Sequence, residues 1–295
     1  MPELPEIVTY LDAIDRRVGG DTLEAIRIKS FSLLRTYDPP LDAVFGKKLT
    51  GLRRMGKRIV FALEGDLFAV LHLMVAGRLH WHEERKPIPG KIGLAAFDFA
   101  SGTIILTEAG TKRRASLHIV CGEEALRELD PGGLELDGAS LQEFKAALLA
   151  ERHTLKRALS DARHISGIGG AFADEILHMA KLSPMQMNTN LSDDEIARLF
   201  AASKITLAKW LEIRRGDAGD GFPEKVRSTH PLMAVHGKYN EPCPVCAAPV
   251  QRIVYASRET NYCPGCQTGG KILADRSLSR LLKDDWPKTI EDLEA

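Results

Sequence analysis

The sequence predicts a multidomain α+β protein with an N-terminal antiparallel β-sandwich or barrel, a helical domain and a C-terminal zinc ribbon. Short apolar runs separated by Gly, Asp and Pro fill the chain up to about residue 120. Beyond residue 138 the apolar residues recur at helical spacing. Two CxxC pairs then stand near the C-terminus. These three patterns follow one another along the chain, so we expect separate domains.

The composition is that of a globular protein, and the chain is long enough for two domains. The chain has 295 residues, and its 40 Lys and Arg residues balance its 40 Asp and Glu residues. Net charge therefore gives no sign of a polyanionic partner, although a local basic patch is compatible with it. The absence of an eighteen-residue apolar stretch and of a signal-peptide pattern predicts a cytoplasmic protein without membrane attachment.

A helix from Pro5 to Val18 opens the chain, because Ile7, Leu11, Ile14 and Val18 share one helical face before Gly19-Gly20 ends it. Strands are expected at RIVFAL, LFAVLHLM, LAAFDFA and TIILT. The lone Cys121 is expected to be a small buried hydrophobe.

Residues 130–138, DPGGLELDG, form a predicted linker to the helical domain. Three helices should follow, at LQEFKAALLAERHTLKRALSD, GGAFADEILHMAKL and DDEIARLFAASKITLAKWLEIRR. Ser192 and Glu195 have the spacing of a capping box at the start of the third. The Gly-rich stretch RRGDAGDGFPEKVRSTHP then predicts a mobile loop.

The two CxxC pairs predict a metal site. Sixteen residues separate them, which suits a ribbon that holds one structural Zn²⁺ on four thiolates; a redox dithiol is the alternative. The predicted ligands are Cys243, Cys246, Cys263 and Cys266. In the tail, Ile272, Leu273, Leu278, Leu281 and Leu282 predict a short helix packed on the ribbon, with a partner-binding segment as the alternative.

A glycine turn before the second predicted helix suits an anion. Gly167, Gly169 and Gly170 would leave backbone N–H groups accessible at a helix N-terminus, where a DNA phosphate could bind; a simple packing turn is the alternative. Basic residues gather at positions 47–58 and 112–114, where they form either a phosphate-binding surface or a solvated face.

The opening MPELPEI raises a chemical expectation. Removal of Met1 would leave Pro2 with a secondary amine, and terminal amines have a pKa of roughly 8, so part of it is neutral and nucleophilic at pH 7. Attack on C1′ of a sugar would give an iminium ion and a route to strand cleavage. Glu3 is placed to supply acid–base catalysis. An unstructured chain start is the alternative.

Five motifs together resemble the formamidopyrimidine-DNA glycosylase and endonuclease VIII family. They are MPELPEI, GKRIVF around Lys57, LHLMVAGRL around His72, GIGG before a helix, and HGKYNEPCPVC with RETNYCPGCQ. The resemblance spans residues 1 to about 267. It implies a β-sandwich, a helix-two-turn-helix domain and a zinc hairpin that together grip double-stranded DNA containing damaged bases or abasic sites.

The resemblance also implies an activity and its residues. The expected activity is a base excision repair glycosylase and abasic-site lyase that removes oxidised purines, formamidopyrimidine and 8-oxoguanine, through a Schiff base on Pro2. Glu3 would be the general acid, with Glu6 supporting it, and Lys57 and Arg258 would assist the eliminations at the phosphates. The residues expected to bind DNA are His72, Arg113, Arg114, Gly167, Gly169 and Gly170.

Three departures from the family pattern bear on specificity. Gly170 stands where an asparagine usually follows GIG, and TEAGTKRRASL has no aromatic where the purine-repair branch has Arg-Arg-Phe-Gly. Met74 is displaced by one position, so Val75 stands at the wedge. Alternative functions are therefore an oxidised-pyrimidine glycosylase of the endonuclease VIII type and a damage-binding protein without base excision. A zinc-ribbon protein without catalysis would not need the N-terminal Pro-Glu.

The expected domains are residues 1–135, the catalytic β-sandwich with its leading helix; 136–235, the helix-two-turn-helix domain; 236–270, the zinc-ribbon hairpin; and 271–295, the tail. We expect a cytoplasmic, nucleoid-associated monomer.

Overall fold

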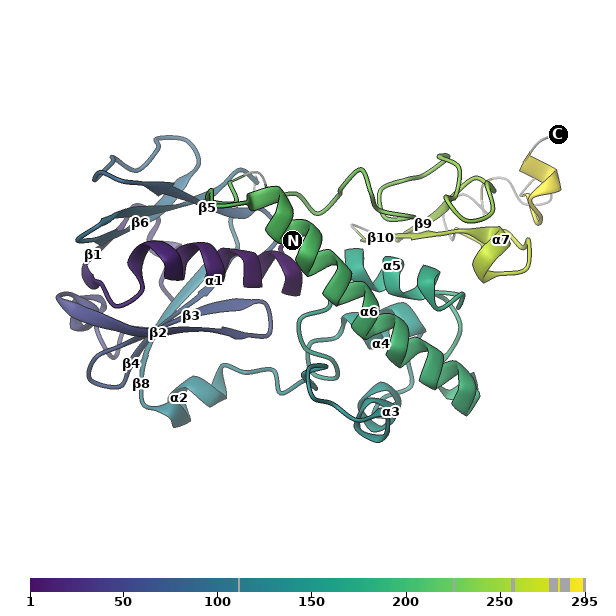
Figure 1. Cartoon of the computed structure of the whole chain (residues 1–295), viewed down its shortest axis with the longest axis horizontal. Coiled ribbons are helices and arrows are strands. Elements are labelled where there is room, and N and C mark those ends of the chain that lie inside the picture. Colours follow the sequence, from purple (N-terminus) through teal and green to yellow (C-terminus); the bar gives the residue numbers. More distant parts are fainter. Residues whose placement is uncertain (111, 225, 256–257, 276–280, 282–286, 294–295) are drawn as a thin grey trace. The chain divides into compact units, whose positions relative to one another are not determined.

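A computed structural model describes residues 1–110, 112–224, 226–255, 258–275, 281 and 287–293 (Figure 1). The chain forms two compact units. The first consists of Met1–Pro131 and Lys209–Arg227, and the second of Gly132–Ala208 and Ser228–Ala295. Within the described residues, no helix has the length and apolar character needed to cross a membrane.

The first unit is built on antiparallel strands that follow the leading helix α1 (Leu4–Val18). The strands pair in the order β5-β7-β6-β1-β2-β3-β4-β8. Their bounds are β1 Thr22–Ile28, β2 Lys47–Met55, β3 Arg58–Leu63, β4 Leu67–His72, β5 Gly77–His82, β6 Gly93–Phe99, β7 Gly102–Glu108 and β8 Ser116–Cys121. Short helices η1 (Phe31–Leu33), η2 (Leu41–Val44) and α2 (Glu123–Glu128) complete it.

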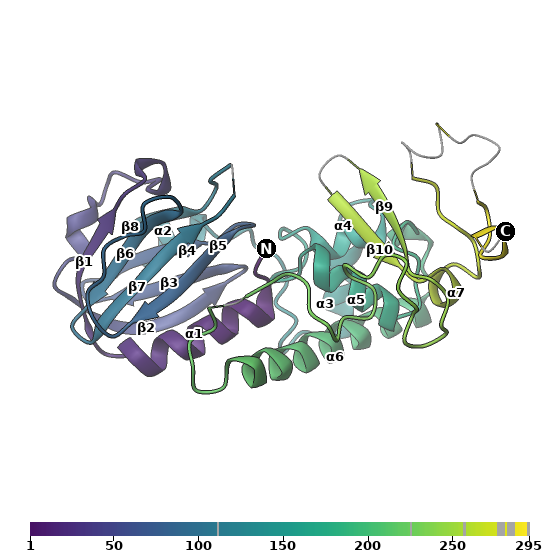
Figure 2. The same ribbon diagram turned by 90° about the horizontal axis from the view of Figure 1, so that it is seen from above.

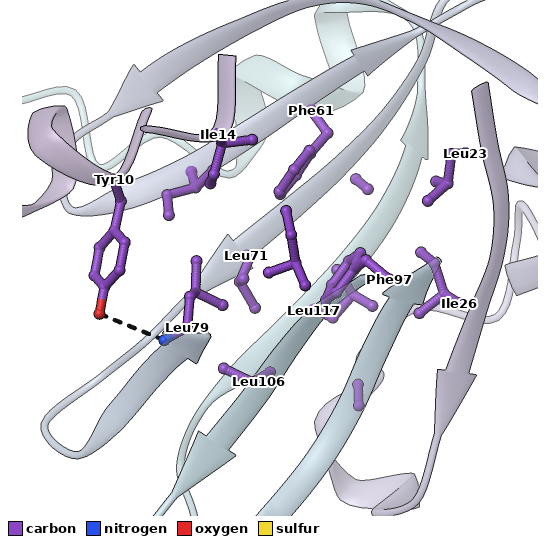
Figure 3. Packing of buried hydrophobic residues seen from close by; sticks show 14 of the residues in the cluster. Tyr10, Ile14, Leu23, Ile26, Phe61, Leu71, Leu79, Phe97, Leu106 and Leu117 are labelled. Carbon is purple, nitrogen blue, oxygen red and sulfur yellow. Dashed lines mark hydrogen bonds between the residues drawn. The ribbon is translucent and has the colours of Figure 1, made fainter. Parts of the chain in front are cut away.

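The sheet folds over so that its two halves face each other. Phe61 on β3 stacks on Phe97 on β6, with ring centroids 5.6 Å apart, although two strands lie between β3 and β6 in the pairing order. Such a contact requires a sandwich rather than a flat sheet. Tyr10 of α1 reaches the same core, where its hydroxyl oxygen accepts a hydrogen bond of 3.4 Å from the Leu79 N–H (Figure 3). The predicted α+β fold with an antiparallel β domain is confirmed.

The leading helix and the four predicted strands are confirmed to within two residues at each end. Strands β1, β2, β5 and β8 were not predicted individually. β2 carries the basic residues 47, 48, 53 and 54, so it lacks an apolar run. The expectation for Cys121 is wrong: it shares the face of β8 that carries Leu117 and Ile119, but it is the last residue of an edge strand and is exposed.

The last part of the long helix α6 (Asp193–Ala218) belongs to the first unit. Arg215 there forms an ion pair of 2.8 Å with Asp12 of α1, and Phe222 lies 5.8 Å from the Tyr10 ring. The helix continues three residues beyond its predicted end at Arg215, so the Gly-rich segment begins later than expected.

The second unit contains helices α3 (Leu141–Leu149), α4 (Leu155–Ser160), η3 (Asn188–Asn190), α5 (Gly170–Met179) and the first part of α6 (Figure 2). The capping box of α6 is confirmed: the Ser192 N–H donates to Glu195 at 2.9 Å, and the Glu195 N–H donates to the Ser192 hydroxyl at 3.2 Å.

The single helix predicted over residues 141–161 is wrong, since the chain breaks into α3 and α4. Asn188, which is fully buried, explains the break. Its amide nitrogen donates to the carbonyls of Leu148 and Glu151 at 2.7 and 2.6 Å, and its oxygen accepts from the His153 N–H at 3.1 Å. A side chain distant in sequence thus satisfies backbone groups that a continuous helix would have paired internally.

The C-terminal hairpin pairs β9 (Gln251–Tyr255) with β10 (Arg258–Tyr262), followed by α7 (Pro264–Gln267). The tail returns over it: Lys271 bridges Thr289, and the Leu273 N–H donates to the Tyr262 hydroxyl at 2.7 Å. A turn η5 (Glu291–Leu293) ends the described chain. Ile272 and Leu273 are not helical, so the predicted tail helix does not begin there. Leu278 and Leu282 lie outside the described residues.

Candidate active site

In the first unit, the chain terminus lies in a buried, charged environment. Burial lowers the pKa of the Met1 amine; Arg78 and Lys57 add to this effect, whereas Glu3 and Glu6 oppose it. Pro2 is buried beside it. An amine whose pKa is lowered is more often neutral at pH 7, and the neutral form is the nucleophile.

Glu3 and Glu6 cap the first turn of α1 reciprocally. The Glu3 side chain accepts from the Glu6 N–H, and the Glu6 carboxylate accepts from the Glu3 N–H at 2.9 Å. Each residue is only 2% exposed. The sequence Pro-Glu-Leu-Pro-Glu therefore does more than start a helix, because it fixes two carboxyl groups beside the terminal amine.

Arg214 anchors Glu6 from the other side. Its Nε donates to Glu6 at 2.9 Å, its Nη2 donates to the Arg227 carbonyl at 2.9 Å, and its guanidinium lies over Trp210. Burial raises the pKa of Glu6 to about 7, with Arg214 opposing the rise and Glu3 adding to it. Glu6 thus titrates near neutrality, which the sequence alone did not reveal.

Lys57 and His72 lie at one end of neighbouring strands. Lys57 directly precedes β3, and Arg58 pairs with His72 across β3 and β4. Lys57 is 9% exposed. Burial, then the charges of Arg58 and Lys57, lower the pKa of His72 to about 4. At neutral pH His72 is therefore an uncharged hydrogen-bonding group beside two cations.

The turn after β4 presents one apolar side chain. Met74 adopts a left-handed backbone, with φ of 51°, and its sulfur contacts the His72 ring. Val75 is 60% exposed. Arg78, at the start of β5, donates to the Val226 carbonyl. The departure from the family pattern thus leaves Val75, rather than a methionine, projecting from this turn.

A buried carboxylate shapes the loop after β7. Glu108 is 2% exposed and accepts hydrogen bonds from the backbone N–H groups of Arg114 and Ala115, at 3.0 and 3.1 Å. Both arginine side chains of this loop are exposed, and Arg113 donates to the Lys91 carbonyl at 2.6 Å. Thr111 lies outside the described residues.

A cavity of about 470 Å³ opens beside Glu6 in the first unit. The end of α6 and the segment after it form one wall, and α1 and Trp81 form another. Arg17 lies over the rings of both Trp81 and Phe222. The full lining consists of Glu6, Thr9, Arg17, Trp81, Arg214, Asp217, Ala218, Phe222, Pro223, Glu224 and Val226.

In the second unit, the predicted glycine turn leads into α5. Gly167 has a φ of 78°, Gly169 is the N-cap, and Gly170 is the first helical residue. A Cβ added at Gly170 would meet only the Lys156 Cε, at 4.0 Å. The turn therefore has the geometry of an anion site, and space for a side chain remains at position 170.

Charged groups behind this turn connect α5 to its surroundings. Lys156 Nζ lies 2.7 Å from Asp174 and donates to the Glu259 carbonyl at 2.6 Å, while His236 Nδ1 lies 2.9 Å from Asp174. Glu175 accepts from the N–H groups of residues 234, 235 and 236, at 2.9 to 3.0 Å. Arg258 is exposed at the start of β10. This network ties the hairpin to the helix that begins at the glycine turn.

The four predicted cysteine ligands converge in the second unit. Cys243 and Cys266 have their sulfurs 3.9 Å apart, and Cys246 and Cys263 have theirs 3.3 Å apart. Tetrahedral zinc with Zn–S bonds of ~2.3 Å places its sulfurs ~3.8 Å apart. The N–H groups of Val245 and Cys266 also point at ligand sulfurs, at 3.4 Å, as suits thiolates. The cysteines therefore fit one structural Zn²⁺.

The predicted site residues thus form two groups. The first unit brings together Pro2, Glu3, Glu6, Lys57 and His72, and it holds Arg113 and Arg114 on the Glu108 loop. The second unit holds the glycine turn, Arg258 and the four cysteines.

The sequence reasoning missed Arg214, Glu108, Lys156, Asp174 and Glu175. The adjacent acids Asp174 and Glu175 were a usable signal, because they interrupt an otherwise apolar helix.

Family comparisons match the chain in three segments. The formamidopyrimidine-DNA glycosylase N-terminal domain matches residues 1–114, and the formamidopyrimidine-DNA glycosylase H2TH domain matches residues 132–219. The zinc finger found in FPG and IleRS matches residues 240–269. The last match agrees with the clustered thiols, so the protein carries one structural zinc.

Full-length relatives are also similar. The formamidopyrimidine-DNA glycosylase of Heliobacterium modesticaldum is 30% identical over 279 residues, covering 90% of this chain and all of that protein. The Thermus thermophilus protein of the same name is 29% identical over 92% of this chain and all of its own. The solved Lactococcus lactis Fpg in complex with abasic-site DNA is 23% identical, covers 90% of this chain and 99% of that one, and has a TM-score of 0.79, which establishes a common fold.

Proposed function

Because the chain belongs to the formamidopyrimidine-DNA glycosylase family, a family of DNA-repair glycosylases, we propose that it excises oxidised purines and then cleaves the abasic site through a Schiff base on Pro2. The observation that carries this proposal is the buried terminus, where an amine of lowered pKa lies with Glu3, Glu6 and Lys57. Loss of Met1 would put the Pro2 nitrogen in that environment.

Base removal would begin with attack of the Pro2 nitrogen on C1′. The C1′–N bond to the base breaks, and the sugar ring opens as its oxygen takes a proton, giving an iminium ion between Pro2 and C1′. Glu3 is the proposed donor of a proton to the departing base, and its carboxylate then passes the proton lost by the Pro2 nitrogen to the ring oxygen. Glu6 supports Glu3 through the reciprocal cap, and Arg214 holds Glu6 in place.

Strand cleavage would follow from the iminium ion. It acidifies the C2′ protons, so that loss of one expels the 3′ phosphate, and a second elimination expels the 5′ phosphate. We assign Lys57 and Arg258 to these phosphates, because both are cations and the leaving groups are anions. Hydrolysis of the Schiff base then frees Pro2.

DNA binding is assigned to groups in both units. His72, neutral at pH 7, would donate to a phosphate, and the N–H groups of Gly167, Gly169 and Gly170 would donate to a second phosphate. Val75 would enter the gap left by the extruded base, with Arg113 and Arg114 on the opposite strand. Solved relatives hold DNA with an abasic site or with Fapy-dG. We propose a monomer acting on DNA in the cytoplasm.

The extruded base would occupy the cavity beside Glu6. Trp81 and Phe222 offer apolar faces, and Glu6 and Glu224 offer carboxyl groups to the edge of a base. A volume of about 470 Å³ suits a small ligand.

Oxidised pyrimidines are the second candidate substrate. The segment from Lys112 to Ala115 contains no aromatic residue that would mark purine repair. Nicking of duplexes that carry 8-oxoguanine, formamidopyrimidine or an oxidised pyrimidine separates the two candidates.

Borohydride trapping tests the chemistry. Protein lacking Met1 should form a covalent adduct with abasic-site DNA, whereas protein that retains a peptide tag before Pro2 should form none. Equal trapping by the tagged protein would show that another amine is the nucleophile. Binding of the damaged duplexes without trapping or nicking would instead support the third candidate, a damage-binding protein.

A further inference from the structure

A histidine lies against the cysteine cluster without belonging to the four predicted ligands. His178 is on α5, in the last turn, and is 7% exposed. Its Nε2 lies 3.3 Å from Cys243 Sγ. Neither the glycine turn at the other end of α5 nor the proposed chemistry at Pro2 uses this side chain.

The site therefore offers five donors for four metal positions. His178 Nε2 and the sulfurs of Cys243, Cys263 and Cys266 all lie within 4.8 Å of one another. A tetrahedral site with three Zn–S bonds and one Zn–N bond of ~2.0 Å would need N···S distances of ~3.5 Å. Since its Nε2 lies no more than 4.8 Å from any of the three sulfurs, His178 is within reach of such a site.

The five donors differ in their exposure to solvent. Cys243 and Cys263 are 3% and 0% exposed, whereas Cys246 is exposed. Cys246 is therefore the thiol that an oxidant or an alkylating reagent reaches most easily. Its loss would leave three sulfurs and, beside them, one imidazole.

The helix that carries His178 is fixed to the hairpin independently of the metal. Glu175 accepts three backbone N–H groups from the segment that leads to Cys243. Gln267, next to Cys266, donates through its amide nitrogen to the Leu182 carbonyl at 2.8 Å. These bonds hold the imidazole beside the sulfurs whether or not Cys246 is a ligand.

We propose that His178 is a reserve ligand of the zinc centre. With all four thiolates bound, its Nε2–H donates to the Cys243 thiolate and orients it, as groups around a metal site commonly do. When Cys246 is lost, the ring proton shifts to Nδ1 and the Nε2 lone pair replaces the missing sulfur. The centre thereby changes from four thiolates to three thiolates and one imidazole, and Zn²⁺ is retained.

Metal content of the full-length variants tests this proposal. Cys246→Ser should retain about one zinc per chain after dialysis, whereas Cys263→Ser, which removes a buried thiol, should lose most of it. The double variant Cys246→Ser/His178→Ala should also lose its zinc, while His178→Ala alone should keep it. With all four cysteines present, His178→Ala should release zinc to a chelator about tenfold faster than the wild-type protein does.

Cobalt substitution supplies an independent readout. The thiolate-to-metal charge-transfer band should fall by about a quarter in Cys246→Ser, and the ligand-field bands should shift as nitrogen replaces sulfur. Two results would overturn the proposal: zinc loss from Cys246→Ser as complete as from Cys263→Ser, or equal zinc retention by Cys246→Ser and the double variant. Unfolding of Cys246→Ser counts as the first of these results.

Discussion

The role assigned to Glu3 depends on its burial. Glu3 is 2% exposed, and its carboxyl is fixed by the cap on the first turn of α1. A side chain held in this way is oriented before any substrate arrives, which is the condition for effective proton transfer. The motif indicated which residues to consider, whereas the structure adds why they are rigid.

Replacement of Glu3 by Gln should separate the two activities proposed here. Glutamine keeps the hydrogen-bond acceptor for the cap but cannot donate a carboxyl proton. We expect base excision to fall by roughly a hundredfold, because the departing base requires protonation, and cleavage of a preformed abasic site to fall by less than about tenfold. Single-turnover nicking on the two substrates measures both rates. Equal losses on the two substrates would contradict the assignment of Glu3.

Glu6 should make stability depend on pH. Its pKa is about 7 in the folded protein against an ordinary value of 4.5, so the folded state binds the proton more tightly. The stabilisation of the folded state by this proton is complete below pH 4.5 and is lost as the pH rises to about 7. A shift of this size corresponds to a few kcal/mol.

Urea unfolding at several pH values between 4.5 and 8 measures this dependence. The Glu6→Gln variant has no titrating group at this position. Its free energy of unfolding should therefore fall less than that of the wild type as the pH rises. Glu212, exposed on α6, provides the matched control, and Glu212→Gln should behave as wild type. A Glu6→Gln variant with an unchanged pH slope would show that Glu6 is ionised throughout.

Some single residues were beyond prediction from sequence. Cys121 was assigned to the interior because cysteines are often buried, yet it lies at the very end of the edge strand β8 and is exposed. Arg214 was one of several basic residues near the end of a helix. Only the fold shows that it reaches Glu6.

At the scale of elements, apolar runs were predicted well and polar or interrupted elements were not. β3 and β6 are nearly continuous apolar strands, whereas β2 exposes lysine and arginine and lacks that pattern. The break between α3 and α4 depends on Asn188, which lies 40 residues beyond Leu148 in the chain. Local periodicity carries no information about such a distant partner.

The N-terminus of α5 should accept the side chain that the family usually has there. Gly170 has space beside it and no left-handed φ, so Gly170→Asn should fold without strain. An added amide that donates to a phosphate should tighten binding to abasic-site DNA by about tenfold, the equivalent of one charge-assisted hydrogen bond of ~1.4 kcal/mol.

Gly170→Ala is the control for this prediction, since it adds the Cβ without the amide. Fluorescence anisotropy with a labelled abasic duplex compares the two variants. If Asn binds no more tightly than Ala, the amide makes no phosphate contact. A loss of folding in both variants would mean that the glycine is needed for the backbone itself.

On the scale of the whole molecule, the first unit and the C-terminal hairpin depend on different sources of stability. The first has an extensive apolar core between its sheet halves, whereas the hairpin buries a small group consisting of Val235, Cys243, Val250 and Cys263. Structural zinc supplies on the order of 10 kcal/mol in zinc-finger peptides. The CxxC spacing allowed this division to be predicted.

Zinc removal should therefore affect the hairpin and the first unit unequally. After chelation under reducing conditions, hydrogen exchange should accelerate by at least about a hundredfold in β9 and β10, while β3, β4 and β6 keep their protection. Mass spectrometry of peptides resolves these strands, and zinc added back should restore the hairpin. Equal deprotection of the hairpin and of the first unit would show that the zinc stabilises more than the hairpin.

The return of residues 209–227 to the first unit has a consequence for the order in which the protein is made. Glu6 and Arg214 are 208 residues apart, so a ribosome releases the amino-terminal strands long before the helix end that pairs with the leading helix. Until then Glu6 lacks both its guanidinium partner and the residues of this segment that line the cavity beside it. The nascent sandwich can form, but the wall of the cavity made by Asp217, Phe222 and Val226 is completed only after most of the chain has been translated.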